Sequence, residues 1–149
     1  MKKIKIGLLA LLIVSLALLS LYLINTLKTK SLSNDILVDV NFDKVKAKFV
    51  YDTQTDKSQD FDKNESEKIM QIFKKVELKR VLKTPKTKDT YIVVVGGSGG
   101  SFLFNVSDDG FVLLDKTLNK YYKFVDKKLL DDLLNIIISN THRVEATEK

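Results

Sequence analysis

Hydrophobic residues fill the start of the chain without interruption and are interspersed with polar residues in the rest. Residues 6–24 contain no charged side chain. As a helix they would be roughly 28 Å long, close to the hydrocarbon thickness of a bilayer. Lysines flank this run on both sides, at Lys2, Lys3, Lys5, Lys28 and Lys30. The pattern predicts an N-terminal transmembrane helix.

The charged start of the chain is typical of a secretory signal, but the apolar run exceeds the usual h-region of roughly 7 to 15 residues. No small-residue cleavage site follows the run. We therefore expect residues 1–30 to be an uncleaved signal-anchor with a short connector, a cleaved signal peptide being the alternative. The lysine excess before the run favours an amino terminus in the cytoplasm. The predicted location is the cell membrane, single-pass, with the C-terminal domain outside the cytoplasm.

Beyond residue 30 the pattern changes to short alternating segments and two helical repeats. Residues 64–76 repeat apolar side chains at helical spacing, with Asp62 or Asn64 as the expected N-cap. A second helix is expected from the cap residue Asp126 to about residue 140. Alternation predicts strands at residues 36–40, 45–51, 76–82, 90–95, 101–106, 111–115 and 120–124.

The order of these segments, β-β-α-β-β-β-β-β-α, predicts an α+β domain. Links of two to five residues between the later strands favour hairpins, so the sheet should be mainly antiparallel with both helices packed on it. We expect the domain to span residues 31–142, followed by a polar tail at 143–149. Its core should include Ile69, Phe73, Leu130 and Leu134.

Composition limits the classes of partner and chemistry. The chain has 25 Lys and Arg against 19 Asp and Glu, a net charge of +6. Residues 1–30 hold five lysines and no acid, which leaves 20 basic against 19 acidic residues in the remainder. A nearly neutral domain does not favour a nucleic-acid partner. Without cysteine, the chain has no disulfide and no thiolate metal site.

Two segments, residues 67–73 and 121–134, follow a lysine-rich apolar N-terminus. Together they give a Glu-Lys-Ile-x-x-Ile-Phe helix and a Tyr-Tyr-Lys-Phe strand leading into a Leu-Leu-x-x-Leu-Leu helix. This layout resembles small membrane- or lipid-anchored extracytoplasmic domains of unknown function from low-GC Gram-positive bacteria. Lipid-anchored members carry a lipobox cysteine, which this chain lacks. The resemblance implies no catalytic residues.

Two motifs suggest chemistry that their surroundings do not favour. Residues 96–100 satisfy Gly-x-Ser-x-Gly around Ser98, but a nucleophile elbow needs a helix after it, and a strand pattern follows here. The only histidine, His142, lies near the end of the chain. Residues 60–64 resemble the start of an EF-hand loop, yet Glu65 and Gln71 replace the required Gly and Glu. We therefore expect a hairpin loop, no catalytic residue, no metal and no cofactor.

One basic cluster is the candidate site. It consists of Lys79, Arg80, Lys83, Lys86 and Lys88. Functionally these residues could contact an anionic surface. A solvated strand edge and loop is the alternative interpretation.

The sequence therefore favours a binding or interaction domain of the bacterial envelope rather than an enzyme. The expected partner is another envelope protein, a peptide or an anionic wall polymer, and not nucleic acid. Two alternatives stay open. One is a small envelope enzyme whose polar site is scattered along the chain, and the other is an anchored immunity or protective protein.

Overall fold

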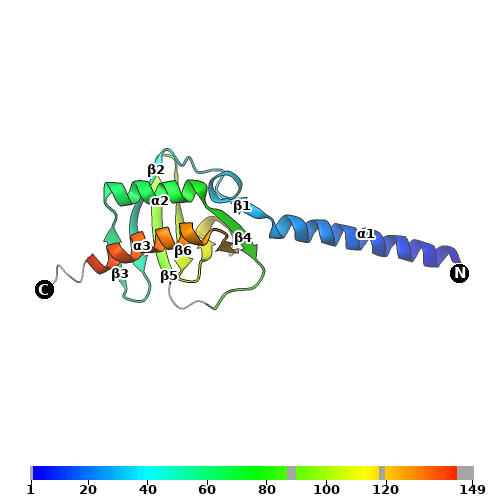
Figure 1. Ribbon diagram of the computed structural model, residues 1–149. Coiled ribbons are helices and arrows are strands. Elements are labelled where there is room, and N and C mark those ends of the chain that lie inside the picture. Colours follow the sequence, from blue (N-terminus) through cyan, green and yellow to red (C-terminus); the bar gives the residue numbers. More distant parts are fainter. Residues whose placement is uncertain (1, 87–89, 118–119, 144–149) are drawn as a thin grey trace.

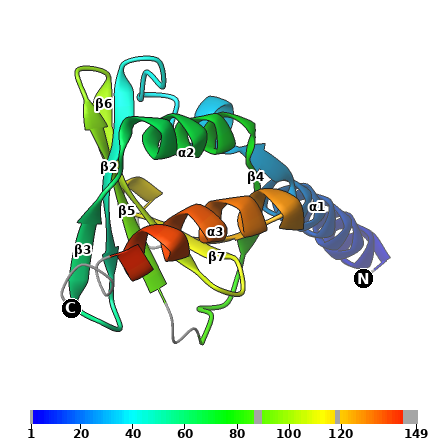
Figure 2. The same ribbon diagram turned by 60° about the vertical axis from the view of Figure 1, so that its left-hand side comes forward.

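The structure, a computed structural model, describes residues 2–86, 90–117 and 120–143, with side chains described for 11–86, 90–117 and 120–141. One antiparallel sheet carries helices α2 and α3 on the same face (Figures 1 and 2). Helix α1, Lys2–Leu27, projects away from this sheet (Figure 1). The α+β class predicted from the sequence is therefore confirmed.

Within the described residues the sheet has eight strands in the order β1-β4-β8-β7-β6-β5-β2-β3, and each neighbouring pair is antiparallel. The strands are β1 Thr29–Ser31, β2 Val45–Asp52, β3 Lys57–Asp60, β4 Glu77–Val81, β5 Thr90–Gly97, β6 Gly100–Ser107, β7 Phe111–Leu114 and β8 Tyr121–Phe124. The predicted meander is present in β5 to β8. Strand β4 pairs with β8 although more than forty residues separate them in the chain.

Helix α2, Lys63–Lys75, is capped by Asp62, one of the two residues expected there, and the other, Asn64, lies within the helix. The Asp62 carboxylate accepts a hydrogen bond from the Glu65 N–H at 2.8 Å, and the Glu65 carboxylate accepts one from the Asp62 N–H at 3.0 Å. This reciprocal pair is a capping box. Helix α3, Lys127–Arg143, starts after Asp126, whose carboxylate accepts from the Lys128 N–H at 2.8 Å. It extends three residues past the predicted end.

The core lies between the two helices and the sheet face that they cover. Phe73 of α2 is fully buried, and its ring centroid lies 4.5 Å from that of Phe104 and 6.0 Å from that of Phe102. The four predicted core residues are all buried: Ile69, Phe73, Leu130 and Leu134. An antiparallel sheet that is covered on one face buries alternate residues, which explains why alternation in the sequence predicted most of the strands.

Three segments differ from the prediction. Residues 29–31, next to the expected connector, form β1, which pairs with β4. Residues 36–40 are not a strand: Leu32–Ile36 form a short π-helical turn, and the side chain of Val38 is exposed. The turn forms because the Ser31 hydroxyl accepts from the Asn34 N–H while the Asp35 carboxylate accepts from the Ser31 N–H. Residues 57–60 form β3, which was not predicted from the sequence. An edge strand pairs through its backbone, so its side chains can be polar and need not alternate with apolar ones.

The glycine-rich segment is the turn between β5 and β6, as expected. Gly99 donates its N–H to the Lys44 carbonyl at 3.3 Å and accepts from the Asn41 N–H at 2.9 Å. A Cβ on Gly97 or Gly99 would collide with the backbone oxygens of Lys44 and Asn41. These glycines therefore allow close backbone packing.

The prediction of a transmembrane helix is wrong. Among the described residues, no helix combines the length and the apolar character needed to cross a membrane. The predicted single-pass cell-membrane location, with the domain outside the cytoplasm, is corrected with it.

Candidate functional site

The sheet has a second face that neither α2 nor α3 covers, and partly exposed side chains line it. Because residues alternate along each strand, the register assigns them to this helix-free face. One cross-strand row consists of Val81, Tyr121, Leu113, Asn105, Ile92 and Tyr51. The row is mainly apolar or aromatic, yet most of its members are only half-buried.

A pocket of about 320 Å³ lies on the helix-free face above β5, β6, β7 and β8. Its apolar lining comes from Ile92, Leu113, Phe111 and Tyr121. Pro85, in the segment that joins β4 to β5, also lines it. The volume is at the lower end of the range of roughly 300 to 1,000 Å³ typical of small-molecule sites.

A second row on the same face brings positive charges together. Lys79 of β4 and Lys123 of β8 are direct cross-strand partners, and Lys123 is in turn paired with Phe111 of β7. The Lys123 ammonium lies 4.9 Å from the centroid of the Phe111 ring, within cation–π range. Like charges directly opposite each other in a sheet destabilise it. The fold therefore places two like charges on neighbouring strands, with the Lys123 ammonium over the Phe111 ring of β7.

No carboxylate of the described residues forms an ion pair with Lys79 or Lys123. Glu77 is the nearest acid along β4 on the same face, two residues from Lys79, and it too makes no ion pair with them. Lys63 and Lys74, by contrast, pair with Glu67 at 4.0 Å and with Asp43 at 2.6 Å. Lys79 and Lys123 thus lack a direct ion-pair partner among the described residues, although Lys123 also borders a second hollow lined by Asp108, Asp109 and Asp131.

The two lysines border a hollow of about 420 Å³ beside the end of α1. Its apolar lining comes from Leu27, Val81 and Leu82, and its charged lining from Lys79, Arg80, Lys83 and Lys123. No acidic side chain of the described residues lines it. This hollow, called the basic hollow below, combines an apolar surface with cations of one sign.

Arg80 has a different environment from Lys79. Its cross-strand partner is Tyr122, which is buried on the helix-covered side of the sheet. Burial raises the pKa of the Tyr122 phenol, and the positive charge of Arg80 offsets part of that rise. Arg80 thus lines part of the basic hollow, and its positive charge also lowers the pKa of the buried Tyr122.

The structure brings together part of the cluster predicted from the sequence. Lys79, Arg80 and Lys83 line one hollow, whereas Lys86 is exposed after Pro85 and does not line it. Lys88 lies outside the described residues. Sequence reasoning missed Lys123, because its pairing with Lys79 depends on a long-range strand contact. The alternation in Tyr-Tyr-Lys-Phe placed Lys123 on the same face as Tyr121 but could not show which residue lies opposite Lys123 on the next strand.

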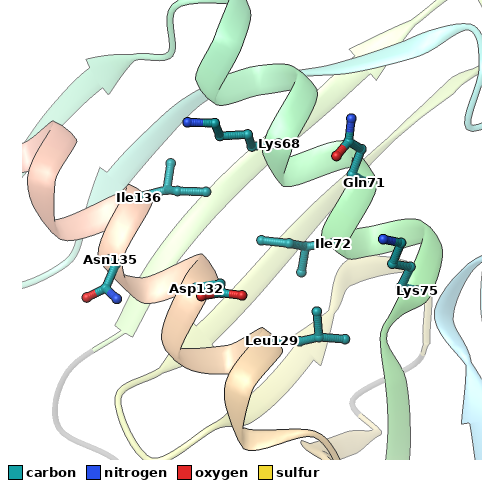
Figure 3. A pocket seen from close by; sticks show the side chains of 8 residues that line it. All are labelled: Lys68, Gln71, Ile72, Lys75, Leu129, Asp132, Asn135 and Ile136. Carbon is teal, nitrogen blue, oxygen red and sulfur yellow. The ribbon is translucent and has the colours of Figure 1, made fainter.

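A groove between α2 and α3 is the main alternative site (Figure 3). Its volume is about 350 Å³, and Ile72, Leu129 and Ile136 provide apolar lining. Lys68 and Lys75 project from α2, and Asp132 faces them from α3 (Figure 3). Both signs of charge therefore occur on its rim, so the groove does not select a ligand charge as the basic hollow does.

A hollow of about 760 Å³ lies where β2 approaches the start of α2. Its lining includes the cations Lys46, Lys48 and Lys63 together with three acids, Asp60, Asp62 and Glu67. Asp62 already caps α2. Mixed charge and the structural use of Asp62 give this hollow no preference for one class of ligand.

Among the described residues no group of three or more His, Cys, Asp or Glu side chains is arranged to hold a metal ion. No protein-family model matches the chain, and no curated protein or solved structure is significantly similar to it. The resemblance of layout noted from the sequence therefore stays a prediction.

Proposed function

We propose that this protein is a binding protein for an anionic ligand, with the basic hollow as its site. The single observation that supports this function is the Lys79–Lys123 pair. The two lysines are direct partners on neighbouring strands, and no described carboxylate forms an ion pair with either of them. A bound anion would convert this repulsion into attraction.

Lys83 strengthens the interpretation, because it approaches the same hollow from the segment after β4. An anion near two or three ammonium groups forms charge-assisted hydrogen bonds, which are roughly twice as strong as neutral ones. The domain without the first thirty residues is nearly neutral. Binding should therefore depend on this local cluster and not on the overall charge.

A binding role also suits the place of Ser98, the one nucleophile that the sequence suggested. Ser98 lies in the turn between β5 and β6, not at a strand-to-helix elbow. A hydrolase would need a base beside that serine. Binding is thus the function that the arrangement of Lys79, Lys83 and Lys123 supports best.

The test is a titration of the full-length protein with inorganic phosphate, followed by amide NMR at low and high salt. We expect shifts centred on β4 and β8, weakened by salt because exposed charges are screened within roughly 10 Å at 0.1 M ionic strength. The double variant Lys79→Gln/Lys123→Gln should lose these shifts. The control Lys68→Gln/Lys75→Gln removes the same charge from the helix-covered side and should retain them. Equal loss in both variants, or shifts spread over both faces, would overturn the proposal.

A further inference from the structure

We propose that the ligand is an amphipathic anion, whose charged head lies between Lys79 and Lys123 and whose flat apolar body fills the neighbouring pocket on the helix-free face. This inference rests on the proposed function and adds the ligand class. It joins two hollows that the sheet places side by side.

The first argument is adjacency. Lys79, Lys123 and Phe111 occupy three neighbouring strands in one cross-strand row. Strands lie about 4.8 Å apart, so an anion held between Lys79 and Lys123 lies within roughly 5 to 10 Å of the Phe111 ring. The partners Val81 and Tyr121 connect the same two hollows in the next row. A single small molecule can therefore reach both.

The second argument is that the side chains of Asn105, Ser107 and Thr53, three polar residues of the pocket, already form hydrogen bonds within the protein. The Asn105 amide donates to the Leu113 carbonyl at 3.0 Å. The Ser107 hydroxyl donates to the Asp109 carboxylate at 2.7 Å and accepts from the Phe111 N–H at 3.0 Å. These groups fix the pocket wall instead of awaiting a ligand.

Thr53 adds to this pattern, because its hydroxyl donates to the Thr90 carbonyl at 2.7 Å. What the pocket offers a ligand is thus mainly the surface of Ile92, Phe111, Leu113 and Tyr121. Half-buried aromatic and aliphatic side chains gain most by contact with an apolar body. The Tyr121 hydroxyl makes no hydrogen bond with another described residue, so it can also bind one polar substituent.

The third argument is size and shape. A volume of about 320 Å³ equals that of roughly ten water molecules. That space suits a body of one or two rings, and flat rings can stack on Phe111 and Tyr121. The Lys123 ammonium already lies over the Phe111 ring, so the anionic head and the ring-binding surface meet at one residue.

The experiment compares three probes on the full-length protein: inorganic phosphate, 2-naphthol and 2-naphthyl phosphate. The five tyrosines are replaced by 3-fluorotyrosine, and the Tyr121 fluorine signal is assigned with Tyr121→Phe. We expect 2-naphthyl phosphate to shift this signal and to bind about ten- to a hundredfold more tightly than phosphate, because the naphthyl group buries apolar area.

Two variants separate the parts of the site. Lys123→Gln should reduce the affinity for phosphate and for 2-naphthyl phosphate alike. Leu113→Gln should remove the naphthyl advantage and leave phosphate binding unchanged. Ile136→Gln, at a half-buried position in the groove between α2 and α3, is the matched control and should change neither.

The outcomes distinguish this inference from the proposed function. If phosphate binds through Lys79 and Lys123 but 2-naphthyl phosphate gains nothing, the inference fails and the function stands. If Leu113→Gln leaves the naphthyl advantage intact, the inference also fails. If 2-naphthol binds as tightly as its phosphate and Lys123→Gln has no effect, the site is an apolar one and both proposals fail.

Discussion

The two faces of the sheet are made of similar residue types but meet different surroundings. On the covered face, Phe102 and Phe104 are almost completely buried against Phe73 of α2. On the helix-free face, Phe111 and Leu113 are only half-buried, and Phe111 lies in one cross-strand row with Lys79 and Lys123. The covered face supplies stability, and the helix-free face keeps unpaired charge and apolar surface accessible.

The largest expected difference in stability is between an apolar residue buried under the helices and one on the helix-free face. Phe73→Ala should lower the free energy of unfolding by about 3 to 5 kcal/mol, because it leaves a cavity beside two other rings. Leu113→Ala, on the helix-free face, should cost about 1 kcal/mol, because the side chain is half-exposed. Urea denaturation of both variants checks this. Equal losses would show that the helix-free face is also part of the core.

A buried polar contact on the covered side should matter next. The fully buried Asn140 amide of α3 donates to the Glu65 carboxylate at 2.7 Å and to the Asp60 carbonyl at 3.3 Å. Asn140→Ala should therefore cost about 1 to 3 kcal/mol in unfolding free energy. Asn135→Ala, at an exposed position of the same helix, is the control and should change stability by less than about 0.5 kcal/mol.

The neighbours Tyr121 and Tyr122 allow a comparison by pH, because they face opposite sides of the sheet. Burial raises the pKa of Tyr122, so its stabilising contribution is complete below the unfolded-state pKa of about 10 and is lost as the pH rises through the folded-state pKa. Tyr122→Phe should flatten the alkaline fall in unfolding free energy. Tyr121→Phe should retain it. An unchanged fall in the Tyr122 variant would contradict the assignment.

The repulsive pair should give a smaller effect of opposite sign. Lys79→Gln removes one of two cations that face each other across β4 and β8. We expect the free energy of unfolding to rise by about 0.2 to 0.5 kcal/mol at low salt, and the gain to disappear at high salt. A matched measurement on Lys68→Gln should show no such gain. Destabilisation by Lys79→Gln would mean that the pair is compensated within the protein.

The smallest effect is expected at an exposed ion pair outside both hollows. The hydrogen bond from Lys74, together with its charge, lowers the pKa of the Asp43 carboxyl. The contribution of Asp43 is thus present above its unfolded-state pKa and lost as the pH falls through the lower folded-state pKa. Lys74→Gln should return the Asp43 titration, followed by carboxyl NMR, towards its ordinary value. Stability at neutral pH should barely change, because exposed pairs contribute little.

Local patterns in the sequence determined much of the fold. Apolar spacing defined α2 and the start of α3, and Asp62 was one of two residues expected to cap α2, because short polar side chains satisfy free N–H groups at a helix start. Alternation placed Tyr121 and Tyr122 on opposite faces. These features depend on residues close together in the chain. The apolar character of residues 6–24 was equally visible, but it did not establish a membrane-spanning helix.

The site was decided by tertiary structure. Alternation shows which face a residue occupies, but the partner across the next strand depends on which strands pair and in what register. Only the pairing of β4 with β8 places Lys79 opposite Lys123 and turns one part of the basic cluster into a hollow, while Lys86 stays apart. The polar edge strand β3 could not be predicted either, because it is held by backbone hydrogen bonds to β2, which do not require a particular type of side chain.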